Sequence, residues 1–200
     1  MDNTTKIALA GEGGQGVQSV ADILAEAGND DGKQALYIPN FGVEQRGGVS
    51  VAYVQISEEQ IGSPKFTKGD IVMALSDRAV DRTNKYVGEH TIFVYDSSLI
   101  EVAENSRDIR PKLPEQAKQI LGLPANDIAK REFHPRVFNI MVLGAVIELS
   151  KVLPPETVKQ AIEKKLKRKF NQNPELREMN MGAFQRGIEL ARESLAGDKF

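Results

Sequence analysis

Glycines cluster directly after the first apolar run of the chain. Residues 11 to 17 read GEGGQGV and follow KIALA, so four of seven residues are glycine. Such a cluster costs conformational entropy, and it therefore indicates a tight turn or a group that approaches the backbone closely. The spacing of Gly11, Gly13 and Gly16 fits the dinucleotide-binding pattern G-x-G-x-x-G, in which N–H groups at a helix start attract phosphate. The chemistry that this loop could support is phosphate binding.

The rest of the sequence only partly supports a nucleotide site there. In dinucleotide-binding folds an Asp or Glu ends the next strand and binds the ribose hydroxyls. Here the next apolar run, ALYI, is followed by Pro39 and Asn40, and the glycine loop contains no phosphate-binding lysine. The alternative is a tight turn that packs a helix against a strand without any ligand. Such a turn explains two of the glycines more easily than it explains the pair Gly13–Gly14.

A second glycine pair follows the second predicted strand, in YIPNFGVEQRGGVS. We expect the first two strands to be parallel neighbours, so this stretch emerges at the same edge of the sheet as the first loop. Arg46, held by glycines, can bind a phosphate or carboxylate with two hydrogen bonds. Equally, Arg46 could pair with Glu44 or with carbonyl groups of the first loop and brace the two turns. The two loops define a hypothetical edge that contacts a ligand or another subunit: Gly11, Gly13, Gly14, Gln15, Gly16, Glu44, Arg46, Gly47 and Gly48.

Short apolar runs that alternate with amphipathic stretches predict the scaffold behind these loops. Buried strands are expected at 6–10, 35–38, 70–76 and 91–97, and a longer, alternating, half-covered strand at 48–57. Helices are expected at 17–28, 78–87 and over most of 136–197. Residues 98–134 carry a weak signal, and we interpret them as a long connection with short helical turns. The pattern favours an α/β fold, a three-layer α/β/α sandwich with a mostly parallel or mixed central sheet and a helical C-terminal third, in a single domain over residues 1–200.

The composition argues against several classes of function. Basic and acidic residues number 26 and 28, which gives a net charge of -2 and argues against a nucleic-acid binder. Without cysteine, this chain carries no disulfide, thiol nucleophile or cysteine-ligated iron–sulfur cluster. With only His90 and His134, a histidine metal site is not expected either. No nucleophile is paired with a base, so we predict no catalytic residue and no metal site on this chain.

Several polar residues stand where strands end or helices begin. Ser76 with Asp77, and Asp96 with Ser97, end strands at the presumed ligand edge, and His134 precedes a strongly apolar helix. Residues of these types at such positions most often cap the next helix. We therefore interpret them as capping residues rather than catalytic ones.

The N-terminus and the apolar runs indicate a soluble protein. MDNTTKIALAG is polar and turns directly into a strand, unlike a signal peptide. The longest apolar stretch, VFNIMVLGAVIEL, is too short to span a bilayer. We expect a cytoplasmic location and no membrane contact.

The two glycine stretches together resemble one protein family. GEGGQGVQSVADILAEAG followed by PNFGVEQRGGVSVAYVQIS is similar to the gamma subunit of 2-oxoacid:ferredoxin (acceptor) oxidoreductases. That family shows a Gly-Gly-Gln-Gly turn, a proline and aromatic-glycine loop, and Glu-x-Arg-Gly-Gly before a long strand. KGDIVMALSD, TIFVYDSS, the helix RVFNIMVLGAVIEL with its Asn139, and LPPETVKQAI also fit. The resemblance extends from around Lys6 to Gly187, and little of it falls between Ile100 and Lys130.

The resemblance implies a subunit of a multi-subunit enzyme of mainly anaerobic or microaerobic carbon metabolism. Such an enzyme decarboxylates a 2-oxoacid on thiamine diphosphate, passes electrons through iron–sulfur clusters to ferredoxin, and transfers the acyl group to coenzyme A. The family's alpha and beta subunits hold thiamine diphosphate, and the clusters lie on beta or on a ferredoxin-like delta subunit. This chain would be a structural, non-redox subunit without a cofactor of its own. Its glycine loops would face either a partner subunit or coenzyme A.

The resemblance leaves the substrate open. Pyruvate, 2-oxoglutarate, branched-chain 2-oxoacids and indolepyruvate all have enzymes with gamma chains or domains of this type. A small chain without a fused ferredoxin part favours 2-oxoglutarate or a general oxoacid enzyme, with pyruvate as the other preferred substrate. The basic run EKKLKRKF is either a solvated helix face or a docking patch for acidic ferredoxin.

Two other classes of function compete with this interpretation. One is a free-standing, nucleotide-binding enzyme with a Rossmann-like fold that uses the G-x-G-x-x-G loop. The other is a scaffold or dimerisation module without a ligand, and a homodimer is one state open to the isolated chain. Exposed apolar surface would favour a subunit or a scaffold, because a lone enzyme would bury it.

Overall fold

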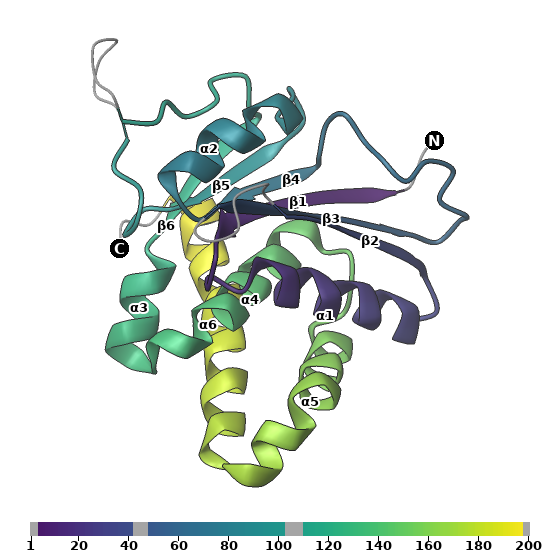
Figure 1. Ribbon diagram of the computed structural model, residues 1–200, viewed down its shortest axis with the longest axis vertical. Helices are drawn as coiled ribbons and strands as arrows, with labels where there is room; N and C mark the ends of the chain where they lie inside the picture. Colours follow the sequence, from purple (N-terminus) through teal and green to yellow (C-terminus); the bar gives the residue numbers. More distant parts are fainter. Residues whose placement is uncertain (1–3, 42–47, 103–109, 198–200) are drawn as a thin grey trace.

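A mixed six-stranded sheet forms the centre of the protein (Figure 1). The computed structural model describes residues 4–41, 48–102 and 110–197. Within them the strands are β1 (Thr5–Glu12), β2 (Gln34–Asn40), β3 (Val49–Ser57), β4 (Ile71–Ala74), β5 (Ile92–Asp96) and β6 (Gln119–Leu123). Their order across the sheet is β2-β3-β1-β4-β5-β6.

The strands divide into a parallel part and an antiparallel part. β1, β4, β5 and β6 run parallel, whereas β3 is antiparallel to both of its neighbours, β1 and β2. All four residues of β4 are buried, as expected for a parallel strand covered on both faces. In β3, Val51 packs into the core on one face and Val54 into the core on the other. The expectation of a half-covered strand was therefore wrong, because β3 is covered on both sides.

Helices cover both faces of the sheet. One face carries α1 (Val17–Asp30), α4 (Phe138–Ser150), α5 (Pro155–Gln172) and α6 (Glu175–Ala196), with α3 (Ala125–Glu132) and the turn η2 (Pro135–Val137) leading into α4. The other face carries the short helix α2 (Asp77–Thr83) and the turn η1 (Asn84–Tyr86) (Figure 1). This arrangement confirms the predicted α/β fold with a mixed sheet and a helical C-terminal third.

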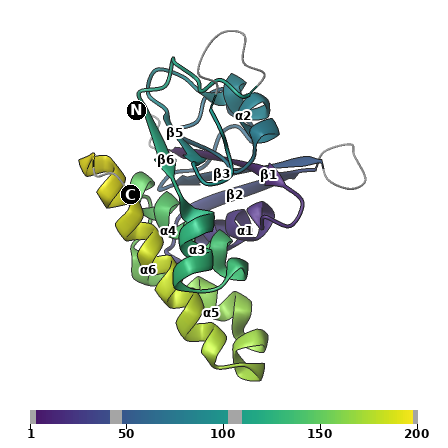
Figure 2. The same cartoon turned by 90° about the vertical axis from the view of Figure 1, so that its left-hand side faces the viewer.

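α4 and α6 cross at two glycines. A Cβ atom on Gly144 would overlap the carbonyl oxygen of Phe184, and one on Gly187 would overlap that of Met141. The two backbones can therefore approach only because both positions lack a side chain. The hairpin of α5 and α6 extends from this crossing and projects away from the sheet (Figures 1 and 2).

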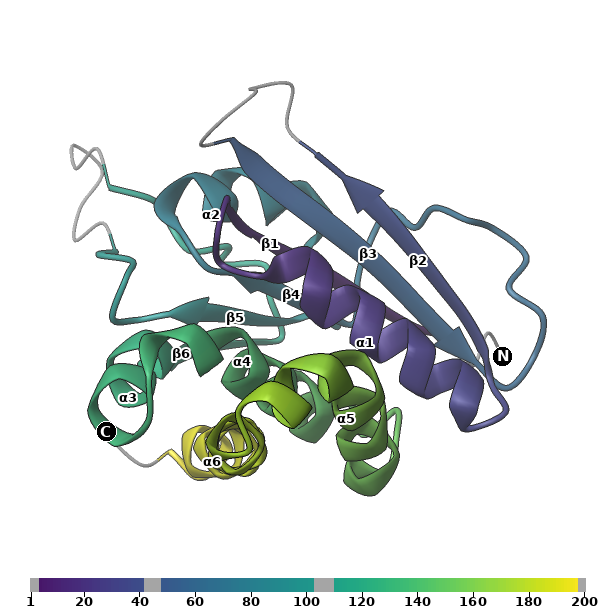
Figure 3. The same cartoon turned by 60° about the horizontal axis from the view of Figure 1, so that its bottom comes forward.

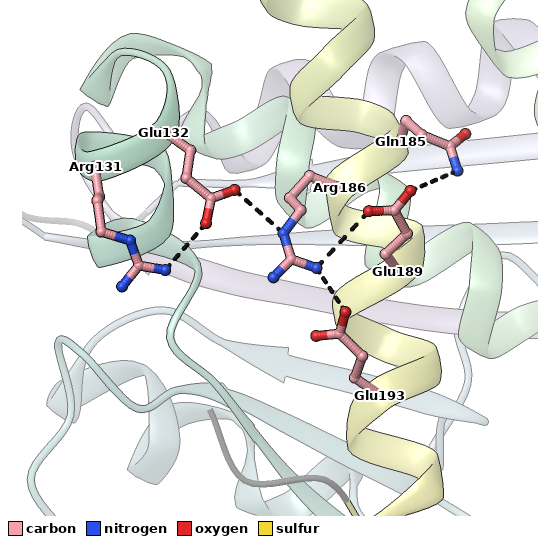
Figure 4. Close-up of polar contacts among 6 residues, drawn as sticks. All are labelled: Arg131, Glu132, Gln185, Arg186, Glu189 and Glu193. Atoms are coloured by element: carbon pink, nitrogen blue, oxygen red, sulfur yellow. Dashed lines mark hydrogen bonds and ion pairs between the residues drawn. The ribbon is translucent and has the colours of Figure 1, made fainter.

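A network of ion pairs and hydrogen bonds connects α3 to α6 (Figure 4). The Nε atom of Arg186 lies 3.2 Å from Oε2 of Glu132 on α3. A terminal nitrogen of the same guanidinium lies 2.8 Å from Oε1 of Glu193, and Glu189 lies at 3.8 Å. Arg186 is half-buried between these carboxylates, so the network connects α3 to α6.

The basic run on α5 is used partly inside the chain. Lys164 pairs with Glu26 at 3.0 Å and with Asp30 at 3.3 Å, and Lys165 pairs with Asp22, all on α1. These contacts clamp α5 to α1. The prediction of a solvated helix face is therefore only partly right, because Lys164 and Lys165 bind the neighbouring helix.

Two predicted boundaries were wrong. Residues 98–134 contain a strand, β6, and an eight-residue helix, α3, where we expected a long connection with short helical turns. The sequence of β6, QILGL, is short, contains Gly122 and pairs only with β5, so its apolar signal is weak. β2 also continues through Pro39, which an edge strand tolerates because it needs fewer N–H donors.

No helix among the described residues combines the length and the apolar character that crossing a membrane requires.

Candidate functional site

The carboxyl ends of β1 and β4 meet at a topological switch point. The two strands are parallel neighbours, with Ala10 beside Ala74. The chain leaves β1 towards α1 on one face and leaves β4 towards α2 on the other (Figure 1). In open α/β sheets such a divergence creates a crevice where ligands bind. Figure 2 shows this edge of the sheet from outside.

Gln15 closes the glycine loop over this edge. Its side-chain oxygen accepts a hydrogen bond from the backbone N–H of Glu12 at 2.7 Å. Its Nε2 donates to the carbonyl oxygen of Leu75, just beyond β4, also at 2.7 Å. A Cβ atom on Gly11 would lie 2.6 Å from the oxygen of Gln15 and 3.2 Å from Cβ of Leu75. Residue 11 must therefore be glycine, because the side chain of Gln15, which links the ends of β1 and β4, occupies the space that a Cβ atom would need.

Gly16 is required for two reasons. It is the N-cap of α1 and adopts φ +74°, a left-handed conformation that side chains disfavour. A Cβ atom there would also lie 2.7 Å from Nδ2 of Asn139, near the start of α4. The loop is thus held between β4 on one side and α4 on the other.

Gly13 and Gly14 differ from the other two glycines. Both are exposed, and no described atom lies within 4 Å of where their Cβ atoms would be. Gly14 adopts φ +95°, which explains its type by backbone conformation alone. Gly13 has neither a positive φ nor a close neighbour, so contacts among the described residues do not explain why it is glycine.

An ion pair spans the two sides of the switch point. Nε of Arg78, in α2, lies 3.1 Å from Oε1 of Glu12, at the end of β1. Ser76 caps α2 by accepting a hydrogen bond from the N–H of Ala79 at 3.3 Å, as predicted. Burial, followed by the charges of neighbouring carboxylates such as Glu12, raises the pKa of Asp77. The sequence analysis did not single out Arg78 as a site residue. Its position directly after Ser76 and Asp77, which follow the end of β4, was a signal that could have identified it.

Asp96, at the end of β5, is a buried structural residue. Its carboxylate accepts hydrogen bonds from the N–H and the hydroxyl of Ser98 at 2.8 and 2.5 Å. It also accepts one from the N–H of Asn126 at 2.9 Å, which caps the start of α3. Burial raises the pKa of Asp96, and these hydrogen bonds act against that rise. The predicted capping roles are confirmed for Asp96 and also for His134, whose Nδ1 accepts from the N–H of Arg136 at 3.1 Å.

The second loop is only partly described. Glu44, Arg46 and Gly47 lie outside the described residues, and Gly48 stands just before β3. β1 and β2 run in the same direction and end at the same edge, as predicted, but they are not neighbours because β3 lies between them. The expectation of adjacent parallel strands was therefore wrong. Phe41, directly after β2, and Leu99, after β5, expose 67% and 39% of their surface near that edge.

The described residues hold no group of three or more His, Asp or Glu side chains that could bind a metal ion. The described part of the candidate site is thus an edge of backbone loops with Arg78 beside it, and such groups can contact a phosphate, a carboxylate or another chain.

A family model for pyruvate ferredoxin/flavodoxin oxidoreductase matches residues 6–190. The chain belongs to this family. The 2-oxoglutarate synthase subunit KorC of Methanocaldococcus jannaschii is 33% identical over 190 residues, which are 94% of each chain. The ketoisovalerate oxidoreductase subunit VorA of Methanothermobacter thermautotrophicus is 31% identical over 194 residues, which are 96% of this chain and 38% of VorA. The family resemblance seen in the sequence is confirmed.

Solved structures of the pyruvate ferredoxin/flavodoxin oxidoreductase family share the fold. The gamma subunit of a keto/oxoacid ferredoxin oxidoreductase from Geobacter sulfurreducens is 30% identical, with a TM-score of 0.77 over 96% of this chain and 98% of that one. The 2-oxoglutarate:ferredoxin oxidoreductase of Magnetococcus marinus, solved with 2-oxoglutarate, coenzyme A and succinyl-CoA bound, is 27% identical, with a TM-score of 0.82. This chain is covered completely in that comparison and corresponds to 33% of the longer one.

Proposed function

We propose that this chain is the gamma subunit of a heteromeric 2-oxoacid:ferredoxin oxidoreductase. The enzyme would convert a 2-oxoacid and coenzyme A into acyl-CoA and carbon dioxide, and ferredoxin would take up the electrons. The family match over residues 6–190 carries the proposal. The nearly end-to-end similarity to KorC favours 2-oxoglutarate as the substrate, with pyruvate as the next candidate. Thiamine diphosphate and iron–sulfur clusters would lie on the partner subunits, which fits a chain without cysteine.

The carboxyl edge of the sheet is the surface that would face those partners. Gly13 supports this assignment, because it is exposed and has no close neighbour among the described residues. Phe41 and Leu99 add exposed apolar surface at the same edge, of the kind that protein contacts bury. α1 starts there without a side-chain cap, so a phosphate of coenzyme A could approach its N–H groups, with Arg78 opposite. Bound coenzyme A would supply the thiol that accepts the acyl group.

Affinity purification of the tagged chain from its own host tests the assembly. We expect recovery of a thiamine-diphosphate-binding pair of subunits together with a cysteine-rich chain. The recovered complex should reduce viologen only when both coenzyme A and a 2-oxoacid are present, faster with 2-oxoglutarate than with pyruvate. Recovery of this chain alone would contradict the proposed function.

A substitution at Gly13 tests the edge separately. Gly13→Val should change the stability of the isolated chain by no more than about 0.5 kcal/mol, because the site is open. In the complex it should weaken assembly or raise the KM for coenzyme A about tenfold, since a side chain would enter the contact. Gln160→Val is the control, because Gln160 is exposed on α5, in the hairpin that projects away from the sheet. Normal assembly and normal KM in Gly13→Val would show that this edge contacts neither partner.

A further inference from the structure

Two adjoining cavities lie against the segment that joins β3 to β4, one beside the end of β2 and the other beside the start of β1. The aromatic pocket has a volume of about 250 Å³ and is lined by Ile38, Pro39, Asn40, Tyr53, Pro64, Lys65, Phe66 and Tyr86. The lysine pocket has a volume of about 630 Å³ and is lined by Thr4, Lys6, Gln55, Ile61, Gly62, Ser63, Lys65, Phe66, Thr67 and Lys68. Lys65 and Phe66 line both. Figure 3 shows this segment folding back beside the edge strand β2.

Three rings shape the aromatic pocket. The centroid of Tyr53 lies 5.8 Å from that of Phe66 and 5.2 Å from that of Tyr86, and each pair is arranged edge to face. Phe66 and Tyr86 are 6.3 Å apart with the same geometry. Edge-to-face rings around a void offer both faces and edges to a planar group. Whole small-molecule sites usually measure about 300–1,000 Å³, so this pocket has the size for one ring system of a larger ligand.

The aromatic pocket also offers a hydrogen-bond donor. The hydroxyls of Tyr53 and Tyr86 share one hydrogen bond, 2.7 Å long. Asn40 also hydrogen-bonds Tyr53, and burial, followed by the bond to Tyr86, raises the pKa of Tyr53. Two hydroxyls that share one bond leave one O–H proton for another acceptor. A ring with acceptor nitrogen atoms fits this pocket better than a hydrocarbon.

The lysine pocket has the chemistry of an anion site. None of the described residues that line it is acidic, although the chain as a whole has a net charge of -2. Nζ of Lys68 donates to the carbonyl oxygens of Lys85 and Val87 at 3.1 and 2.7 Å, which hold the ammonium in place without cancelling its charge. The lining also includes the hydroxyls of Ser63 and Thr67. Lysines and hydroxyls around one cavity are groups that bind phosphate.

The floor of the lysine pocket is built rather than incidental. Gln55 of β3 is 3% exposed, and its Nε2 donates to the carbonyl oxygen of Ser63 at 2.9 Å. This bond ties the covering segment to the sheet.

We propose that the two pockets together bind a nucleotide, with the base in the aromatic pocket and the phosphates beside Lys65 and Lys68. The lysine pocket is distinct from the first glycine loop. Gln55 pairs with Lys6, near the start of β1, whereas the glycine loop follows the end of that strand. The phosphates would therefore point away from the edge assigned to the partner subunits. The ligand would be a free nucleotide, and the nucleotide end of coenzyme A is the other source of the same chemistry.

Calorimetric titration of the full chain distinguishes these sources. We expect ADP or ATP to bind more tightly than adenosine, because the lysines add contacts to phosphate, and more tightly than coenzyme A. Tighter binding of coenzyme A than of ADP, without binding of pantetheine, would support the site but assign it to the substrate. Absence of binding by all of these compounds would overturn the proposal, and it would leave the purification test of the subunit assignment unaffected.

Substitutions locate the binding. Lys65→Ala should weaken ATP binding at least about tenfold and weaken adenosine binding much less, because it removes a charged hydrogen bond to phosphate but only one of the residues that line the aromatic pocket. Tyr86→Phe keeps the ring and should weaken both ligands. Lys118→Ala and Tyr95→Phe are matched controls, since neither residue lines these pockets. ATP binding that survives Lys65→Ala and Tyr86→Phe but disappears in Gly13→Val would place the nucleotide at the glycine loop and overturn the proposal.

Discussion

At the scale of residues, glycines that look alike in the sequence serve different purposes. Gly11 makes room for Gln15, and Gly16 combines a left-handed conformation with a contact to Asn139. Gly13 faces open space. The sequence pattern marked all three, but it could not separate them, because Leu75 and Asn139 come from distant parts of the chain. Gln15 was singled out correctly, and its partner was not predictable for the same reason.

Gly11→Ala should destabilise the chain by about 1–3 kcal/mol, because the added methyl group meets Gln15, Val17 and Leu75. Chemical denaturation of the isolated chain measures this, with Gly13→Ala as the neutral control. In a Gln15→Ala background the same change should cost less, since the nearest obstacle is gone. An equal cost in both backgrounds would show that Gln15 does not impose the glycine.

At the scale of elements, α6 contacts both α3 and α4, and it forms a hairpin with α5. Its crossing with α4 depends on Gly144 and Gly187, and its link to α3 depends on Arg186. The helical spacing of the sequence predicted both α4 and α6. It could not show which of their glycines meet a backbone, because that depends on the crossing angle.

Gly187→Ala should destabilise the protein by about 3 kcal/mol, because the methyl group meets the backbone of Met141 and the helices must separate. Gln185→Ala, at an exposed position of the same helix, should change the stability little. Thermal unfolding of both variants gives the comparison. Similar melting temperatures would indicate that the helices can shift without cost.

The stability that the contact between α4 and α6 contributes should depend on pH, because Glu148 takes part in it. Burial alone would raise the pKa of its carboxyl, but hydrogen bonds from Arg192, at 3.0 Å, and from Lys151 prevail and lower the pKa. The folded state therefore favours the charged form, and the contribution is present at neutral pH and lost as the pH falls through the folded pKa. Glu148→Gln should lower the melting temperature at pH 7, and the difference should shrink below about pH 4. A difference that stays constant with pH would contradict this assignment.

At the scale of the whole molecule, the sequence predicted the layers but not the order of the strands. Apolar runs show which segments are strands and how deeply they are buried. They do not show that β3 returns between β1 and β2, because the alternation in β3 fits several neighbours. β6 was missed since a short edge strand next to prolines gives little periodicity. The two loops nevertheless follow strand ends at the same edge, because β1 and β2 run in the same direction whatever lies between them.

Phe41 and Leu99 should make the isolated chain associate with itself. Phe41→Ser should shift the sedimentation of the isolated chain towards the monomer, because it removes exposed apolar surface at the carboxyl edge. Leu195→Ser, at another exposed apolar position near the end of α6, is the control. Equal effects of the two substitutions would mean that association is unspecific.

Pro39 has a consequence for how other subunits can attach. It stands in β2, the strand at one margin of the sheet, and a proline offers no N–H to a further strand. A neighbouring chain therefore could not extend the sheet past this residue by regular strand addition. At this margin, larger assemblies would therefore have to form through side chains and loops, whereas the strand at the opposite margin, β6, contains no proline.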